Sequence, residues 1–139
     1  MALANVGQSE ESTSYSYSKV VDLSYDDALT KVTAELKKQD FGIITEIDVQ
    51  ATMKKKLDAE IKPYKILGAC NAKFASEALQ QKREIGLFLP CNVIVYVDEN
   101  GKTVVSAVDP VAMMMAVDNP SLGDTAKVRE RLKLVIDSL

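Results

Sequence analysis

The most apolar stretch of the chain reads IGLFLPCNVIVYV and spans residues 85–97. Pro90 divides it, because proline lacks the N–H group that a central strand donates. We therefore predict a central strand over 91–97 and a buried connection or short edge strand over 85–89. Residues 98–101 end in Asn-Gly, which is typical of a tight hairpin turn. Residues 102–108 form the partner strand, and the hairpin makes this pair antiparallel.

Upstream of this stretch, strand and helix patterns alternate along the chain. Side-chain alternation predicts a strand from Thr13 and another over 43–49, the latter with one face buried. Apolar residues at helical spacing predict a helix capped by Ser24 and ended by Gly42, and a second helix that Pro63 closes. These elements lead into the apolar stretch from its N-terminal side.

The flanks of the apolar stretch complete the pattern. A short strand is expected over 64–69, and Asn71 is placed to cap a third helix. Asp109-Pro110 fits a cap followed by proline at the first helical position of a short helix over about 111–116. A turn over 118–120 then leads to a final helix that runs from about 122 to the end.

The resulting order of elements is β-α-β-α-β-α-β-β-α-α. It predicts an α+β fold in which helices pack on a mixed or antiparallel sheet of about five strands. Residues 1–12 are polar and are expected to form a flexible tail. Residues 13–139 are expected to form a single domain, because 139 residues suit one hydrophobic core.

Composition excludes several classes of function. The chain is mildly acidic, with a net charge of −3. Nucleic-acid binding needs clustered positive charge, and anionic lipid attracts basic surfaces, so the charge gives no reason to expect either partner. No apolar run is long enough to span a bilayer. The chain has no histidine, so catalytic triads, Cys-His pairs and histidine-ligated metals within the chain are excluded. We predict neither a nucleic-acid nor a membrane partner, and no cofactor.

The two cysteines, Cys70 and Cys91, do not form a Cys-x-x-Cys pair. Two cysteines in a domain of this size are more often free and buried than bridged. Residues 1–14 lack the regions of a signal peptide, although Ala2-Leu3-Ala4 resembles a tract that precedes a cleavage site. We expect a cytoplasmic protein, with export and a trimmed signal as the alternative.

Three motifs carry a family resemblance: LGACN at 67–71, GLFLPCNVIVY at 86–96 and VDP at 108–110. In this order they resemble the bacterial and archaeal family known as domain of unknown function 302. The likeness extends more loosely over 14–139, and Ala72 departs from the proline that the family often has there. The resemblance implies a small α+β fold that is commonly dimeric, and it implies no established reaction.

The candidate site comprises Cys70, Asn71, Pro90, Cys91 and Asn92. Strand ends and a helix N-terminus are expected to converge there, which is a common setting for a pocket. The leading hypothesis is a non-enzymatic domain that binds a small ligand or a protein and acts as a homodimer. Whether the protein is an enzyme is left open.

The two cysteines support alternatives from other classes of function. Cys70 and Cys91 suit a thiol-dependent enzyme or redox pair, or two soft ligands for Cu(I) or zinc. The plainer interpretation is that both are small buried apolar residues. Met113-Met114-Met115 also contains soft ligands, but three consecutive residues of a helix do not face one way, so core and interface packing is favoured.

Overall fold

The apolar stretch lies at the centre of a five-stranded sheet in the computed structural model, which describes residues 12–115 and 124–139. Strand β4 (Cys91–Val97) has β5 (Thr103–Val108) on one side and β3 (Tyr64–Cys70) on the other. Three of its side chains, Cys91, Val93 and Val95, are buried on one face. The predicted central strand over 91–97 is therefore confirmed.

The hairpin between β4 and β5 closes through Asp98 and Gly101. The N–H of Asp98 donates to the Lys102 carbonyl at 2.8 Å, and the Asp98 carboxylate accepts from the N–H groups of Asn100 and Lys102, both at 2.9 Å. Gly101 has a φ of 76°, in the left-handed region that favours glycine. The Asn-Gly signal thus marks the turn correctly.

All neighbouring strands of the sheet are antiparallel, in the order β1-β5-β4-β3-β2. Strand β1 (Ser16–Val21) forms one edge beside β5, and β2 (Gly42–Asp48) forms the other edge beside β3. The predicted α+β fold with a mixed or antiparallel sheet is confirmed, and the sheet is wholly antiparallel.

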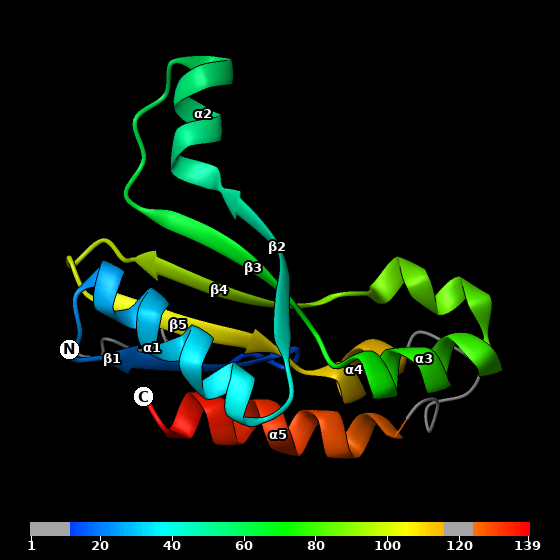
Figure 1. The fold of residues 1–139 in the computed structure, drawn as a ribbon. Coiled ribbons are helices and arrows are strands. Elements are labelled where there is room, and N and C mark those ends of the chain that lie inside the picture. The colour runs from blue at the N-terminus through cyan, green and yellow to red at the C-terminus, as the bar shows by residue number, and fades with distance from the viewer. Residues whose placement is uncertain (1–11, 116–123) are drawn as a thin grey trace.

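Two long helices cover one face of the sheet. Helix α1 (Tyr25–Lys38) and helix α5 (Thr125–Asp137) lie side by side against β1, β4 and β5 (Figure 1). The core between these layers is built from valine, leucine, isoleucine and alanine side chains, including Val32, Leu36, Val95, Val105, Leu132 and Ile136. Burial of this apolar surface is the main stabilising contribution to the fold.

The opposite face of the sheet carries no helical layer within the described residues. Ile94 and Tyr96 on β4 are half-buried there, and the rings of Tyr64 and Tyr96 stack with centroids 5.3 Å apart. Two positions of β5 on this face, Val104 and Ser106, are nevertheless buried by their neighbours. This open face is a broad, partly apolar surface.

The connection between β2 and β3 carries helix α2 (Val49–Leu57), which stands clear of the other helices (Figure 1). No side chain of α2 is buried. The helix ends at Asp58, whose φ of 52° is left-handed, and not at Pro63 as the spacing predicts. We refer to residues 49–63 as the arm.

One boundary prediction and one burial prediction fail for local reasons. Helix α1 ends at Gln39 and Asp40, with Asp40 at a φ of 64°, whereas Gly42 already opens β2. Strand β2 was expected to bury one face, but all its side chains except the half-buried Ile43 are exposed. An alternating pattern is present in β2, yet as an edge strand it has neighbours on one side only.

Three short elements lie beyond one end of the sheet. Helix α3 (Ala72–Gln81) is followed by a 3₁₀ helix, η2 (Arg83–Phe88), where a buried connection or edge strand was expected. Helix α4 (Pro110–Met114) follows β5. The turn over 118–120, the start of the last helix near 122 and all of the predicted tail over 1–12 except Ser12 lie outside the described residues, and α5 is described from Thr125.

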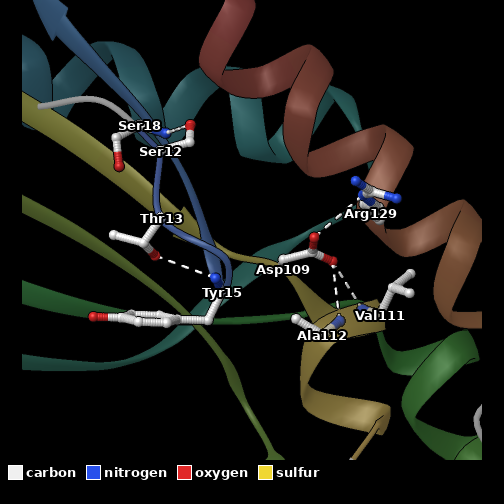
Figure 2. A network of polar contacts seen from close by, with 8 residues as sticks. All are labelled: Ser12, Thr13, Tyr15, Ser18, Asp109, Val111, Ala112 and Arg129. Carbon is white, nitrogen blue, oxygen red and sulfur yellow. Dashed lines mark hydrogen bonds and ion pairs between the residues drawn. The ribbon is translucent and has the colours of Figure 1, made fainter.

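Asp109 joins three parts of the chain (Figure 2). Its carboxylate accepts hydrogen bonds from the N–H groups of Val111 at 2.9 Å and Ala112 at 3.4 Å, which caps α4. Its other carboxylate oxygen lies 3.3 Å from Nε of Arg129 on α5, and its N–H donates to the Tyr15 carbonyl at 2.8 Å. The predicted capping role is confirmed, and the same residue ties β1 and α5 together.

Among the described residues, no helix is long and apolar enough to cross a membrane.

Candidate functional site

Two strand ends and one helix start bring four of the predicted residues together. Cys70 is the last residue of β3, and Cys91 is the first residue of β4, where it pairs with Ala69. Asn71 caps α3, and Pro90 immediately precedes β4. Because β3 and β4 are antiparallel neighbours, the end of one lies beside the start of the other, and all four residues line a single cavity.

The cavity has a volume of about 50 Å³ and almost entirely apolar walls. Helix α3, η2, α4 and the first turns of α5 line it at the end of the sheet, and it is partly open to the surface. Its walls include Phe41, Phe74, Ala78, Ile85, Met114 and Val128. A cavity of this size and polarity suits a small apolar group, since dry apolar cavities are known to bind such groups.

Asn71 is the main polar side chain in the wall. It is only 8% exposed, and its side-chain carbonyl oxygen accepts a hydrogen bond from the Phe74 N–H at 3.3 Å. Its backbone carbonyl accepts from the Ala75 N–H at 2.9 Å. Asparagine is among the preferred N-caps because its short side chain reaches these first amide groups. The cap therefore fixes which way the amide group points.

The two cysteines are free and differ in their surroundings. Cys91 is buried, and burial, with a smaller contribution from the charge of Cys70, raises the pKa of the Cys91 thiol to about 11. Cys70 is half-buried. At neutral pH the Cys91 thiol is protonated, which counts against it as a nucleophile because the thiolate is the reactive form.

Pro90 packs its ring against the backbone of β3 at Gly68. A Cβ atom built on Gly68 would lie 2.8 Å from Cγ of Pro90 and would overlap the side chain of Thr45 on β2. The peptide bond between Leu89 and Pro90 is cis. Only glycine at position 68 lets β2 and the loop before β4 approach β3 this closely.

Asn92 is separated from the other four predicted residues. It follows Cys91 in β4, so its side chain points to the open face, where it is exposed beside Tyr15, Ser18 and Ile94. It does not line the cavity. The repeated Cys-Asn pairs thus look alike in the sequence but place their asparagines in different surroundings.

The sequence does not indicate which other residues come together to form the cavity wall. Phe41 precedes β2, Phe88 lies on η2, and Val128 lies on α5, so the wall gathers residues from distant positions. Within the methionine run, Met114 is 4% exposed while Met115 is 73% exposed. The prediction that the run fills the core and does not form one ligand set is consistent with this split.

No group of three or more Cys, Asp or Glu residues able to hold a metal ion occurs within residues 12–115 and 124–139.

Comparison with known proteins identifies the family of this chain. The family described as "Domain of unknown function DUF302" matches residues 17–139. The chain belongs to the DUF302 family. The crystal structure of an uncharacterized conserved DUF302 protein from Bacillus stearothermophilus is similar, with 27% sequence identity and a TM-score of 0.81. The match covers 88% of this chain and 95% of the Bacillus chain.

No curated protein matches the chain. The DUF302 relatives thus establish the fold and the family, whose description names no reaction or ligand.

Proposed function

We propose that this DUF302 protein is a non-enzymatic binding domain that takes a small, mainly apolar ligand in the cavity at the end of β3 and β4. The observation that carries the proposal is the cavity of about 50 Å³ with apolar walls, in which Cys70, Asn71, Pro90 and Cys91 meet. Small-molecule sites are concave and mostly apolar, with a few polar groups that orient the ligand.

Binding of 1-hexanol, a small neutral amphiphile, tests the proposal. A ligand that binds only the folded state raises the melting temperature. Ala78→Leu, which places a larger side chain in the cavity wall, should abolish this rise while the variant stays folded by circular dichroism. The matched control is Ala51→Leu on the exposed surface of α2, which should leave binding unchanged. Hexanol that binds equally to both variants would rule out the cavity as the site.

We also propose that the protein acts as a homodimer. Support comes from large apolar side chains that are exposed on β2 and the arm: Ile44 at 61%, Ile47 at 49% and Leu57 at 71%. Strand β2 is also an edge of the sheet with unpaired backbone groups. Apolar surface gathered next to a free edge suits a second copy of the chain.

A thiol-dependent redox or enzymatic role is the alternative proposal. It draws support from the presence of Cys70 and Cys91 in the wall of one cavity. The raised pKa of Cys91 argues against it, so any reactive group would be Cys70. Rapid alkylation of Cys70 by iodoacetamide in the folded protein at pH 7 would favour this role. Resistance of both thiols until the protein unfolds would remove it.

We propose that the protein works in the cytoplasm of a bacterium or archaeon. Two free cysteines suit a reducing compartment, where thiols are kept from pairing. The structural relative comes from Bacillus stearothermophilus. Fractionation of cells that produce the protein would test its location.

A further inference from the structure

We propose that two copies of the chain dock through their arms, with the lysine-rich tip of each arm lying on an acidic corner of the other copy. This inference rests on the proposed homodimer and adds which surfaces of the two copies meet. Three features of the described residues support it: a projecting helix without buried side chains, opposite charges at its two ends, and exposed apolar side chains beside both ends.

The arm projects from the molecule. Helix α2 stands clear of the other helices, and none of its side chains is buried (Figure 1). Leu57, the last residue of the helix, is 71% exposed, and Ile61 in the returning segment is 38% exposed. Apolar side chains gain free energy when they leave water, so a projecting segment that exposes them favours contact with a second surface.

The tip of the arm, residues 54–57, is cationic. The whole arm contains four lysines and two carboxylates, a net charge of +2, so the rest of the chain carries −5 and the whole chain −3. The Lys54 ammonium already lies 2.7 Å from the carboxylates of both Asp58 and Glu60. Lys55 and Lys56 form no ion pair within residues 12–115 and 124–139. Their two charges are therefore available to a partner.

The base of the arm is acidic. Asp48 caps α2, Glu46 precedes it on β2, and Asp26 lies in the first turn of α1. These three carboxylates, the acidic corner, surround Tyr25: burial is the main cause that raises the pKa of its hydroxyl, and the charges of Asp48, Asp26 and Glu46 raise it further. All three are exposed, and among the described residues only Glu46 has an ion-pair partner, Lys65 at 3.7 Å.

The acidic corner and the tip lie at opposite ends of α2, so two antiparallel arms bring each tip to the corner of the other copy. In a two-fold dimer the same pair of surfaces meets twice. The exposed apolar side chains follow the same division, since Leu57 belongs to the tip while Ile47 lies between Glu46 and Asp48 on β2. One arrangement therefore pairs opposite charges and covers apolar surface at both contacts.

The charges also favour a second copy over a polyanion such as nucleic acid or an anionic lipid surface. A polyanion that meets the tip also comes close to the acidic corner at the other end of the same short helix, where it is repelled. A second copy instead offers an acidic surface to the tip and a basic surface to the corner.

Sedimentation equilibrium of charge-reversed variants tests the inference. The tip variant is Lys55→Glu with Lys56→Glu, and the corner variant is Asp26→Lys with Glu46→Lys. Each variant alone places like charges together at both contacts, so its dissociation constant should rise at least about tenfold over that of the wild type. In an equimolar mixture, opposite charges face each other at both contacts again, and mixed dimers should form with nearly wild-type affinity.

The matched control is Lys73→Glu with Lys127→Glu. It makes the same charge change as the tip variant, and both lysines are exposed. They flank the start of α3, which follows the end of β3 remote from the arm, so dimerisation should be unchanged. Circular dichroism checks that each variant folds. If the reversed corner does not fold, Asp26→Asn with Glu46→Gln replaces it and should also weaken the dimer, by a smaller factor.

The possible results separate this inference from the proposed homodimer. If the wild type is a monomer, both fail. If the wild type is a dimer and the tip and corner variants dimerise equally well, the homodimer stands and the arm contact is wrong. If the two variants are monomers and their mixture is also monomeric, the pairing of tip with corner is wrong.

Two further measurements apply to the wild type. Raising the salt concentration from about 0.05 M to about 0.5 M should weaken the dimer, because salt screens exposed charges. A dimer that is unaffected or strengthened by salt would be held by apolar contact alone, contrary to the inference. A monomeric wild type whose binding to phosphatidylglycerol vesicles is lost in the tip variant would assign the tip to an anionic lipid surface and overturn it.

Discussion

Gly68 lies at the closest approach of three parts of the structure: β3, the Thr45 side chain of β2 and the ring of Pro90. Gly68→Ala would place a methyl group in contact with both side chains. Thr45 is β-branched and the proline ring is rigid, so neither relieves the overlap cheaply.

We expect Gly68→Ala to lower the free energy of unfolding by about 1–3 kcal/mol, the usual cost of overpacking. Urea denaturation measures it. Gly42→Ala is the matched control on β2, since a Cβ there meets no atom within 4 Å. Equal stability of the two variants would show that Pro90 and Thr45 move aside.

The raised pKa of the Cys91 thiol predicts that the protein is less stable at high pH. Its folded pKa is raised to about 11, from an ordinary value of 9.0. Between these two pH values the Cys91 thiol is deprotonated in the unfolded chain but still protonated in the folded protein. The free energy of unfolding therefore falls as the pH rises. The contribution of the protonated Cys91 thiol to the free energy of unfolding is fully present below pH 9. By about pH 11 up to about 2–3 kcal/mol of this free energy is lost.

Urea denaturation from pH 8 to pH 11 checks this prediction by comparing the wild type with Cys91→Ala. Tyrosines and lysines titrate in both proteins, so the difference between their slopes isolates the thiol. The variant is expected to be less stable at pH 8 and to show a flatter pH dependence. Parallel curves would contradict a buried, protonated Cys91.

Caps are the residues whose roles the sequence predicts best. Ser24, Asn71 and Asp109 all accept hydrogen bonds from N–H groups two or three residues ahead, as expected from their positions. A cap depends on the few residues that follow it, so a local pattern contains the necessary information. Asn92 shows the opposite case, because its surroundings depend on which face of β4 is covered.

At the scale of elements, α2 is the least integrated part of the structure. None of its side chains is buried, and its ion pairs, such as Lys54 with Asp58 at 2.7 Å, are exposed. Exposed ion pairs contribute little to stability. The helix is therefore expected to matter for contacts with other molecules more than for folding.

Replacing residues 50–63 by Asn-Gly tests the role of the arm. Asp48 and Lys65 are register partners, so Val49 and Tyr64 would face each other across a two-residue turn. We expect the shortened protein to fold and its free energy of unfolding to change by less than about 1 kcal/mol, as for surface changes generally. Circular dichroism and urea denaturation measure both. If the shortened protein does not fold, the arm is required for the stability of the fold.

Edge strands and short apolar segments are where element predictions fail. The periodicity of β2 resembles that of a half-buried strand, but β2 is an edge strand with a neighbour on one side only, and its side chains stay exposed although α1 contacts it. Short apolar runs are also ambiguous between strand and helix, as the 3₁₀ helix over Arg83–Phe88 illustrates. The central strand β4 escapes this ambiguity because Pro90 marks its start and the Asn-Gly turn follows its end.

At the scale of the whole molecule, the exposed apolar side chains of β2 and the arm predict self-association. Light scattering should give a mass near twice 15.2 kDa at micromolar concentration. Ile47→Lys, on β2, should shift the protein toward the monomer by placing charge in the contact. Leu87→Lys on η2 is the control, because Leu87 is more exposed, at 79%, and lies far along the chain from the arm. A wild-type monomer would refute the homodimer.

The candidate site was only partly predictable at this scale. The cavity lies where strand ends and a helix start converge, and local patterns located those ends at Cys70, Asn71 and Cys91. The remaining walls come from α4, α5 and η2, which no spacing rule connects. Which helices meet at the end of a sheet is decided by the packing of the whole chain.

The order of the strands has a consequence for how the protein is made. Ser16 pairs with Val108, 92 positions later, and Val21 pairs with Thr103, 82 positions later. At about 5–20 residues per second, translation needs roughly 4–18 s to cover these separations. Strand β1 therefore leaves the ribosome well before β5, while β3 and β4 are nearer neighbours in time. The first strand of this domain to be synthesised is among the last to be paired, and until then its edges are open to chaperones or to other chains.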